Sequence, residues 1–330
     1  MSTVGPYMLY GTLLVNACSL YGTDYADITG EVAWTRENAR KFQSMAVKSG
    51  ARIMSLCGCD SIPWDMCTFM VNDEMKTKHG ERLESIEFFN HGEGGFSGGT
   101  IATMFHGIEQ GAPKVNNIGR TEDPHFTVPG QKSGNGFRLQ NNNCRIINYD
   151  WSRGVWTGFA IMAIVNVEVV EKSNCLLGYK DGLKYSEASI LASPFMGYVL
   201  YVVLAILGTV PFCPPLSWIA RKFVLPKQGE GPSEEVQTNG FLEIVGEGKG
   251  DKGSVVNCVS TFKGDPGYSQ TARMLGETGL CFVFNNEELK LGGGMHTTAS
   301  GLGKVLLKRL TDTGTTFNFY NPRAPKAKQD

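Results

Sequence analysis

Two short motifs place glycines and acidic or hydroxyl side chains directly after strands that the sequence predicts. Gly5-Pro6-Tyr7 ends one such strand, and Gly58-Cys59-Asp60-Ser61 follows another. Parallel α/β sheets bind ligands outside the carboxyl ends of their strands, so both motifs would lie on one rim. The glycine in each would let the backbone approach a ligand, and Asp60 or Ser61 could orient a substrate or transfer a proton. The alternative is structural: the first motif turns the chain, Ser61 caps the next helix, and Asp65 complements the helix dipole.

Two further motifs could bind a substrate or donate a proton. Gly98-Gly99-Thr100 precedes a predicted helix, where backbone N–H groups could bind the polar end of a substrate. Tyr268 in the motif Asp265-Pro266-Gly267-Tyr268 could donate a proton. Both also have a structural interpretation, because a glycine turn can pack beneath strands and Asp-Pro is typical of a helix start.

Short strands alternate with helices in residues 1–80, which predicts a parallel, doubly wound sheet of the α/β class. The expected strands are 24–29 and 52–56, and the expected helices are 9–20, 35–49 and 62–79. Residues 81–290 predict an α+β domain with a mixed sheet, with strands at 82–90, 240–248 and 254–264 and helices at 159–177 and 265–284. We expect little regular structure in residues 111–145, and a disordered tail at 321–330.

Seven stretches resemble the saccharopine-dehydrogenase-like family of oxidoreductases, which includes the trans-acting enoyl reductases of lipid synthesis. They are Val4-Gly5-Pro6-Tyr7, Tyr25-Ala26-Asp27-Ile28-Thr29-Gly30-Glu31, Gly50-Ala51-Arg52-Ile53, Cys57-Gly58-Cys59-Asp60-Ser61-Ile62-Pro63-Trp64-Asp65, Ser97-Gly98-Gly99-Thr100, Gly229-Glu230-Gly231-Pro232-Ser233-Glu234 and Gly264-Asp265-Pro266-Gly267-Tyr268. None is diagnostic alone, but seven in the family's order across nearly the whole chain make the resemblance specific.

The resemblance implies hydride transfer from a nicotinamide cofactor, NAD or NADP, bound near Gly5-Pro6-Tyr7 and Gly58. It also implies that residues 291–320, a helix and a strand, pack back on the first domain. Family members begin with a strand, a glycine-rich turn and a helix that bind the cofactor pyrophosphate. No Gly-x-Gly-x-x-Gly leads from a predicted strand into a predicted helix here, and Met1 matches the end of the family's fourth strand. We therefore expect residues 1–80 to form an incomplete Rossmann-type domain whose cofactor site lacks its phosphate-binding turn.

Residues 188–220 contain no Asp, Glu, Lys, Arg or His. A membrane span needs about 20 apolar residues, so this segment is long enough to cross a bilayer. Its glycines and prolines favour a helix or hairpin lying in one leaflet. The alternatives are a buried core helix and a helix that covers a lipid-binding pocket. The expected lipid-facing residues are Phe195, Tyr198, Leu200, Val203 and Leu207.

The expected partners are therefore a lipid or membrane surface and a lipidic substrate, with a homo-oligomer as a further expectation. We expect the cytoplasmic face of a lipid droplet or of an organelle membrane, mitochondria included, and no secretion, because the first twenty residues lack a signal sequence. The formal net charge of -1 gives no reason to expect nucleic-acid binding. The nine scattered cysteines do not form a metal-binding pattern. A non-enzymatic membrane scaffold that retains the fold stays open as the second hypothesis.

Overall fold

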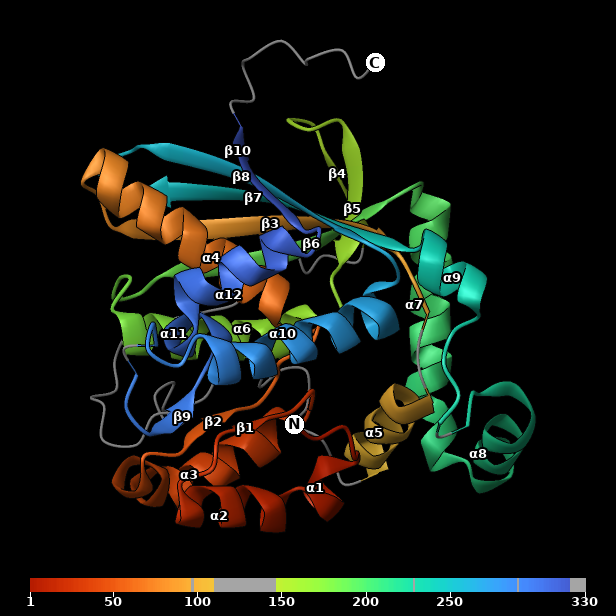
Figure 1. Ribbon diagram of the computed structural model, residues 1–330. Coiled ribbons are helices and arrows are strands. Elements are labelled where there is room, and N and C mark those ends of the chain that lie inside the picture. Colours follow the sequence, from red (N-terminus) through yellow and green to blue (C-terminus); the bar gives the residue numbers. More distant parts are fainter. Residues whose placement is uncertain (96–97, 110–146, 228, 290, 321–330) are drawn as a thin grey trace.

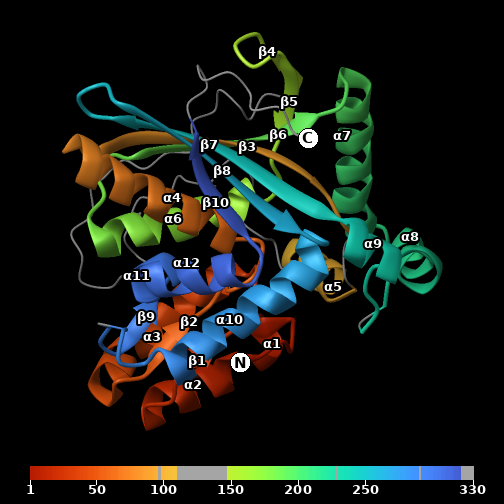
Figure 2. The same ribbon diagram turned by 45° about the horizontal axis from the view of Figure 1, so that its top comes forward.

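The computed structural model describes residues 1–95, 98–109, 147–227, 229–289 and 291–320. The expectations for residues 111–145 and 321–330 lie outside these ranges. Two sheets lie above one another with helices packed between them and around them (Figures 1 and 2).

The smaller sheet is parallel, with the strand order β1-β2-β9. Its strands are β1 (Tyr25–Ala26), β2 (Arg52–Met54) and β9 (Gly294–His296). Ser2 adds a parallel bridge to Asp27 at the edge beyond β1. Helices α2 (Thr12–Tyr21) and α3 (Val32–Ser49) lie on one side of this sheet, and α10 (Thr271–Phe284) and α11 (Thr298–Gly301) lie on the other (Figure 1). The predicted doubly wound α/β sheet is confirmed.

The larger sheet has seven strands in the order β10-β8-β7-β3-β6-β5-β4. β3 and β6 are parallel, and every other neighbouring pair is antiparallel, which confirms the predicted mixed sheet. Every second residue of β7 is buried, because one face of the sheet packs on helices α4 and α6. The strands are β3 (Leu83–Glu93), β4 (Ile147–Asp150), β5 (Val155–Phe159), β6 (Lys184–Leu191), β7 (Phe241–Gly250), β8 (Val255–Lys263) and β10 (Thr316–Tyr320).

The remaining helices differ widely in their surroundings. Helix α4 lies in the middle of the molecule, whereas α7 stands at its edge in both views (Figures 1 and 2). Their bounds are α1 (Tyr7–Tyr10), α4 (Ile62–Glu74), α5 (Gly98–Glu109), α6 (Ala163–Leu177), α7 (Pro194–Thr209), α8 (Pro214–Ile219), α9 (Glu234–Asn239) and α12 (Gly303–Asp312), with short turns η1 (Met75–His79), η3 (Val210–Phe212), η4 (Ala220–Val224) and η5 (Pro266–Gln270).

Three expectations about single elements were wrong. The predicted helix at 9–20 is divided into α1 and α2 at Gly11, where a Cβ atom would lie 2.6 Å from the Trp34 ring. Residues 155–159 form a strand, and the following helix begins only at Ala163. The uncharged segment is not one unit, because residues 188–191 belong to the sheet strand β6 and α7 begins at Pro194. The stretch that could meet lipid is therefore shorter than predicted.

Candidate functional site

The carboxyl ends of the parallel strands meet around Asp27, which follows β1. Its buried carboxylate accepts hydrogen bonds from the Thr29 amide at 3.0 Å, the Ser55 hydroxyl at 3.0 Å and the Leu56 amide at 3.3 Å. Burial raises the pKa of Asp27 to about 6. Leu56 has a φ of 66°, an unusual backbone angle that the bond to Asp27 helps to hold. Asp27 therefore organises the edge where this fold class binds ligands.

The predicted cofactor motif Gly5-Pro6-Tyr7 lies at this edge and begins helix α1. The backbone amides of Tyr7 and Met8 donate to the two carboxylate oxygens of Glu31, at 2.7 and 2.8 Å. The Tyr7 hydroxyl donates to the Ser2 carbonyl at 3.0 Å, and burial raises the pKa of Tyr7 above its usual range. The N-terminus of α1, where an anion would bind, is thus already occupied by the protein's own carboxylate.

The second predicted motif, Gly58 to Ser61, lies against the start of helix α10. The Cys59 amide donates to the Thr271 hydroxyl at 3.0 Å, and a Cβ atom on Gly58 would lie 3.0 Å from the Thr271 methyl group. The glycine is therefore explained by close packing. Asp60 is half-buried, and its carboxylate makes no hydrogen bond within the described part of the chain. The loss of water raises the pKa of Asp60 to about 6.

Ser61 does not cap α4 with its side chain, so that prediction was wrong. Its backbone is in a conformation with φ of -148° and ψ of -45°, and its hydroxyl is buried without a hydrogen-bond partner among the described residues. Asp65 does more than complement the dipole of its own helix. Its carboxylate accepts from the Ser173 hydroxyl at 2.5 Å, the Thr298 hydroxyl at 3.1 Å and the Ala299 amide at 2.8 Å, and so joins α4 to α6 and α11.

The glycine loop and Tyr268 lie together at one corner of the molecule. The Asp265 carboxylate accepts from the Gly95 amide and from the Tyr268 amide, both at 2.6 Å, which confirms the predicted cap by Asp265. The Gly98 amide donates to the Glu230 carbonyl at 2.9 Å, while Gly99 and Thr100 are exposed in the first turn of α5. The Tyr268 ring packs near Gly231 and is partly exposed. The amide of Gly98 is therefore used within the protein, whereas Gly99 and Thr100 are open to solvent.

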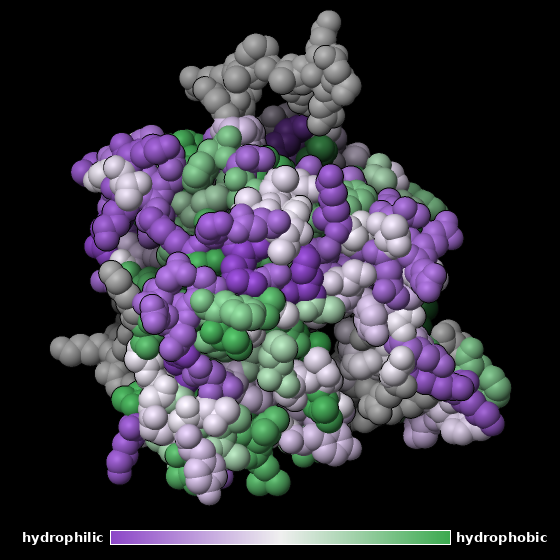
Figure 3. Space-filling view, in the orientation of Figure 1, coloured by the Kyte–Doolittle hydropathy of each residue, from purple (hydrophilic) through white to green (hydrophobic). Residues whose placement is uncertain are grey.

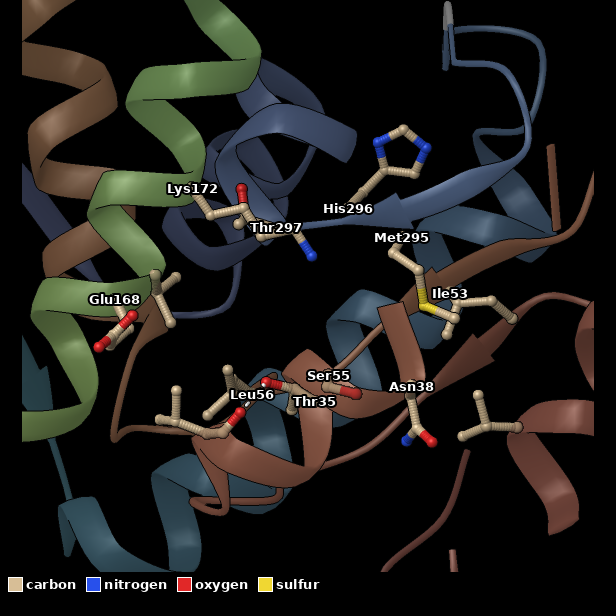
Figure 4. Close-up of a pocket in the computed structure, with 13 residues that line it drawn as sticks. Thr35, Asn38, Ile53, Ser55, Leu56, Glu168, Lys172, Met295, His296 and Thr297 are labelled. Carbon is tan, nitrogen blue, oxygen red and sulfur yellow. Dashed lines mark hydrogen bonds between the residues drawn. The ribbon is translucent and has the colours of Figure 1, made fainter. Parts of the chain in front are cut away.

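A pocket that the sequence did not predict lies beside the ends of β2 and β9. It is a small cavity of about 30 Å³. Lys172 reaches from α6 toward its open centre, with Thr35 and Ser55 opposite (Figure 4). Desolvation lowers the pKa of Lys172 to about 8, and burial together with nearby Lys172 lowers the pKa of His296 to about 4. Sequence reasoning missed both residues because nothing local indicates that α6 lies over the strand ends.

The phosphates of a dinucleotide normally bind at a helix N-terminus. At this edge the N-terminus of α1 holds Glu31, and that of α11 holds Asp65. The spacing Gly248-x-Gly250-x-x-Gly253 does occur, but it joins the antiparallel strands β7 and β8 rather than a strand and a helix. Within the described ranges, these sites do not fit a cofactor phosphate.

Comparison with known proteins agrees with the fold. No family model matches the chain. A protein of Mycobacterium tuberculosis named as a trans-acting enoyl reductase is 32% identical to it, over 96% of this chain and 78% of its own length. A trans-acting enoyl reductase of Mycobacterium ulcerans is 29% identical, over 95% of this chain and 78% of its own length. Apo saccharopine dehydrogenase (L-Glu forming) from Saccharomyces cerevisiae matches with a TM-score of 0.50 and 10% identity, over 96% of this chain and 83% of that one. The chain therefore belongs to the saccharopine-dehydrogenase-like family of oxidoreductases that includes the trans-acting enoyl reductases, as its seven motifs predicted.

Proposed function

We propose that this chain acts in the nicotinamide-dependent reduction of a lipidic substrate at the surface of a membrane or lipid droplet. Its membership of an oxidoreductase family supports the reaction class, and the relatives named as trans-acting enoyl reductases support a reduction. The observation that supports a lipidic substrate and a lipid surface is the set of exposed apolar side chains on α7 and α8. A nicotinamide cofactor would supply the hydride in such a reaction. The rim around Asp27 and Asp60 lies at the strand ends where this fold class binds its ligands.

Helix α7 has little contact with the rest of the protein. Of its residues, all of which are described, Gly197 alone is buried. Among the described residues, Pro194–Phe212 forms one helical stretch that is long and apolar enough to cross a membrane. Of the predicted lipid-facing residues, Phe195, Tyr198 and Val203 are exposed, while Leu200 and Leu207 are half-buried.

The apolar surface continues beyond α7. It includes Phe212, Leu216, Trp218, Ile219 and Phe223. At the lower right of Figure 3, where Figure 1 places α8, a few apolar side chains lie beside hydrophilic ones. The Lys222 ammonium lies 4.6 Å from the Trp218 ring. Tryptophan and lysine together are typical of the boundary between lipid headgroups and acyl chains, and each large apolar side chain buried there contributes roughly 2 kcal/mol.

The contacts of α7 favour a helix lying in one leaflet over a complete span. The Phe159 amide donates to the Tyr201 hydroxyl at 2.8 Å. A Cβ atom on Gly197 would lie 2.8 Å from the side chains of Ile147 and Leu191, so the helix packs closely on strands β4 and β6. One side of α7 is thus attached to the larger sheet while the other is apolar and exposed, which is the geometry of an interfacial helix.

Flotation with phosphatidylcholine vesicles and with triolein droplets tests whether the chain binds a lipid surface. We expect the wild-type chain to float, and the variant Phe195→Ser/Tyr198→Ser/Val203→Ser to remain at the bottom of the gradient. The matched control is Leu9→Ser/Leu13→Ser/Tyr21→Ser, which removes equally exposed apolar side chains from α1 and α2. If both variants float as the wild type does, or both stop floating, the assignment to α7 is wrong.

A non-enzymatic scaffold on the same lipid surface is the second candidate. It is favoured because the N-termini of α1 and α11 already hold the carboxylates of Glu31 and Asp65 and do not fit a cofactor phosphate. Titration with NADPH and NADH separates the two proposals. An oxidoreductase requires a change in nucleotide fluorescence and a higher melting temperature, whereas a scaffold requires neither.

A further inference from the structure

We propose that Lys172 is a reactive amine site, at which the protein forms a Schiff base with short aliphatic aldehydes. The inference does not depend on cofactor binding or on the attachment to lipid. It rests on the pocket at the ends of β2 and β9, on the direction of the lysine side chain, and on the lack of a partner for its ammonium group among the described residues.

The Lys172 amine has no fixed partner in the described part of the chain. No carboxylate lies within 4 Å of it, and no hydrogen bond to it is found there. The nearby acid Glu168 is already paired with Arg36 of α3. In Figure 4 the Glu168 carboxylate points away from the pocket centre, whereas the Lys172 amine points into it. The lysine charge is therefore not neutralised by Glu168.

The hydroxyl groups around the pocket are also used elsewhere. Ser55 donates to Asp27, and Thr35 donates to the Val32 carbonyl at 2.8 Å. Thr297 lies 2.6 Å from the Ser173 hydroxyl and accepts from the Ser300 amide. Apolar side chains make up much of the remaining wall, namely Val15, Val32, Ile53, Leu56, Val169 and Met295. This lining solvates an ammonium ion poorly and a neutral amine well.

Four ionisable groups lie on the elements around the amine, namely Asp65, His296, Arg36 and Glu168. Asp65 of α4 favours the charged form of Lys172, and His296 of β9 is neutral near pH 7 because its pKa is lowered to about 4. Arg36 and Glu168 form their own pair at the pocket edge. Desolvation outweighs the attraction of Asp65, so the pKa of Lys172 falls to about 8. At pH 7.4 roughly a fifth of such lysines are neutral, against about one in a thousand for a lysine with the ordinary pKa near 10.4.

The size of the pocket limits the partner to a small molecule. A cavity of about 30 Å³ has room for one or two water molecules, so it admits the carbonyl group of a small aldehyde. The neutral amine would add to the aldehyde carbon and form a carbinolamine, and the amine proton would move to the oxygen. Loss of water then gives the imine, so the reaction needs no oxidant or reductant. The apolar wall suits an aliphatic chain, and the exclusion of water favours the imine over its hydrolysis.

Borohydride trapping tests the proposal on the full-length chain. The protein is incubated with propionaldehyde and sodium cyanoborohydride at pH 7.4, and each lysine is followed by peptide mass spectrometry. Lys304, whose side chain is 70% exposed, serves as the surface reference. We expect Lys172 to be alkylated at least about tenfold faster than Lys304, because far more of it is neutral. Equal rates, or faster labelling of Lys304, would overturn the proposal.

Two variants and a pH series complete the test. Lys172→Arg keeps the charge but removes the nucleophile, so the rapid phase should vanish, whereas Lys304→Arg should leave it unchanged. The rate at Lys172 should level off above about pH 8, while that at Lys304 should still rise at pH 10. If Lys172→Arg fails to fold, the order of labelling in the wild-type protein still decides. A rapid phase that persists in folded Lys172→Arg would show that the reactive amine lies elsewhere.

Discussion

Helices α4 and α7 are both rich in apolar residues, but the protein uses them in opposite ways. Nine of the thirteen residues of α4 are buried, whereas one of the sixteen residues of α7 is. Around α4, side chains from both sheets and from α6 and α12 complete the core. Around α7, one flank touches β4 and β6 and the other is exposed. An apolar sequence indicates that a helix avoids water, and only its packing shows whether protein or lipid replaces that water.

The comparison is tested most strongly by placing the same charge in both helices. Met66 of α4 is fully buried, whereas Val203 of α7 is exposed. We expect Met66→Lys to cost about 4 kcal/mol or more, enough to unfold the chain, because an unpaired ammonium would be buried. Val203→Lys should change the free energy of unfolding by less than about 0.5 kcal/mol. Urea denaturation followed by circular dichroism measures both. Equal losses would mean that α7 belongs to the folded core.

The next largest effect is expected at Asp65, the buried carboxylate that joins α4 to α6 and α11. Asp65→Ala removes the acceptor for Ser173, Thr298 and the Ala299 amide, and leaves buried donors without partners. We expect a loss of about 2–4 kcal/mol in the free energy of unfolding. Asp312→Ala is the control, because Asp312 is exposed and its partner among the described residues is the neighbouring Lys308 on the same helix. A small loss for Asp65→Ala would show that α11 is not held by this carboxylate.

The sequence predicted the parallel sheet, the mixed sheet and the cap at Asp265, because these depend on local patterns. Strand alternation, glycine stops and Asp-Pro starts are readable within a few residues. It missed the role of Asp65 and the pocket of Lys172 for a physical reason. The partners of Asp65 lie 108 to 234 residues away along the chain, and the pocket of Lys172 forms only when α6 covers β2 and β9. Long-range packing decides both sites, and no local spacing indicates it.

If the exposed surface of α7 and α8 binds lipid, a change at Trp218 should have an intermediate effect on vesicle binding. Its side chain is exposed beside Lys222 on the surface that continues from α7. We expect Trp218→Ala to weaken vesicle binding about fivefold to tenfold, which corresponds to about 1 kcal/mol, without changing the free energy of unfolding. Trp151→Ala is the matched control, because Trp151 is exposed in the turn between β4 and β5. Cosedimentation with vesicles measures both. An equal loss for Trp151→Ala would contradict a binding surface confined to α7 and α8.

The smallest expected effect concerns Asp60, just before α4. It distinguishes Asp60, whose carboxylate has no hydrogen bond to any described residue, from Asp65, whose carboxylate has three. Asp60 has a folded-state pKa of about 6, raised by burial, so the folded protein holds this proton more tightly than the unfolded chain does. The contribution of Asp60 therefore makes the wild type less stable as pH rises from about 4 to 6. Asp60→Asn removes this charge and should stabilise the protein at pH 7 by about 1 kcal/mol, with no difference below about pH 4. Burial also raises the pKa of Asp65 to about 6. Asp65→Asn should nevertheless destabilise the protein at pH 7, because the Ala299 amide and two hydroxyls would face an amide that accepts less well. Urea titrations at pH 4 and 7 distinguish the two variants, and a destabilised Asp60→Asn at both pH values would mean that Asp60 has a hydrogen-bond donor.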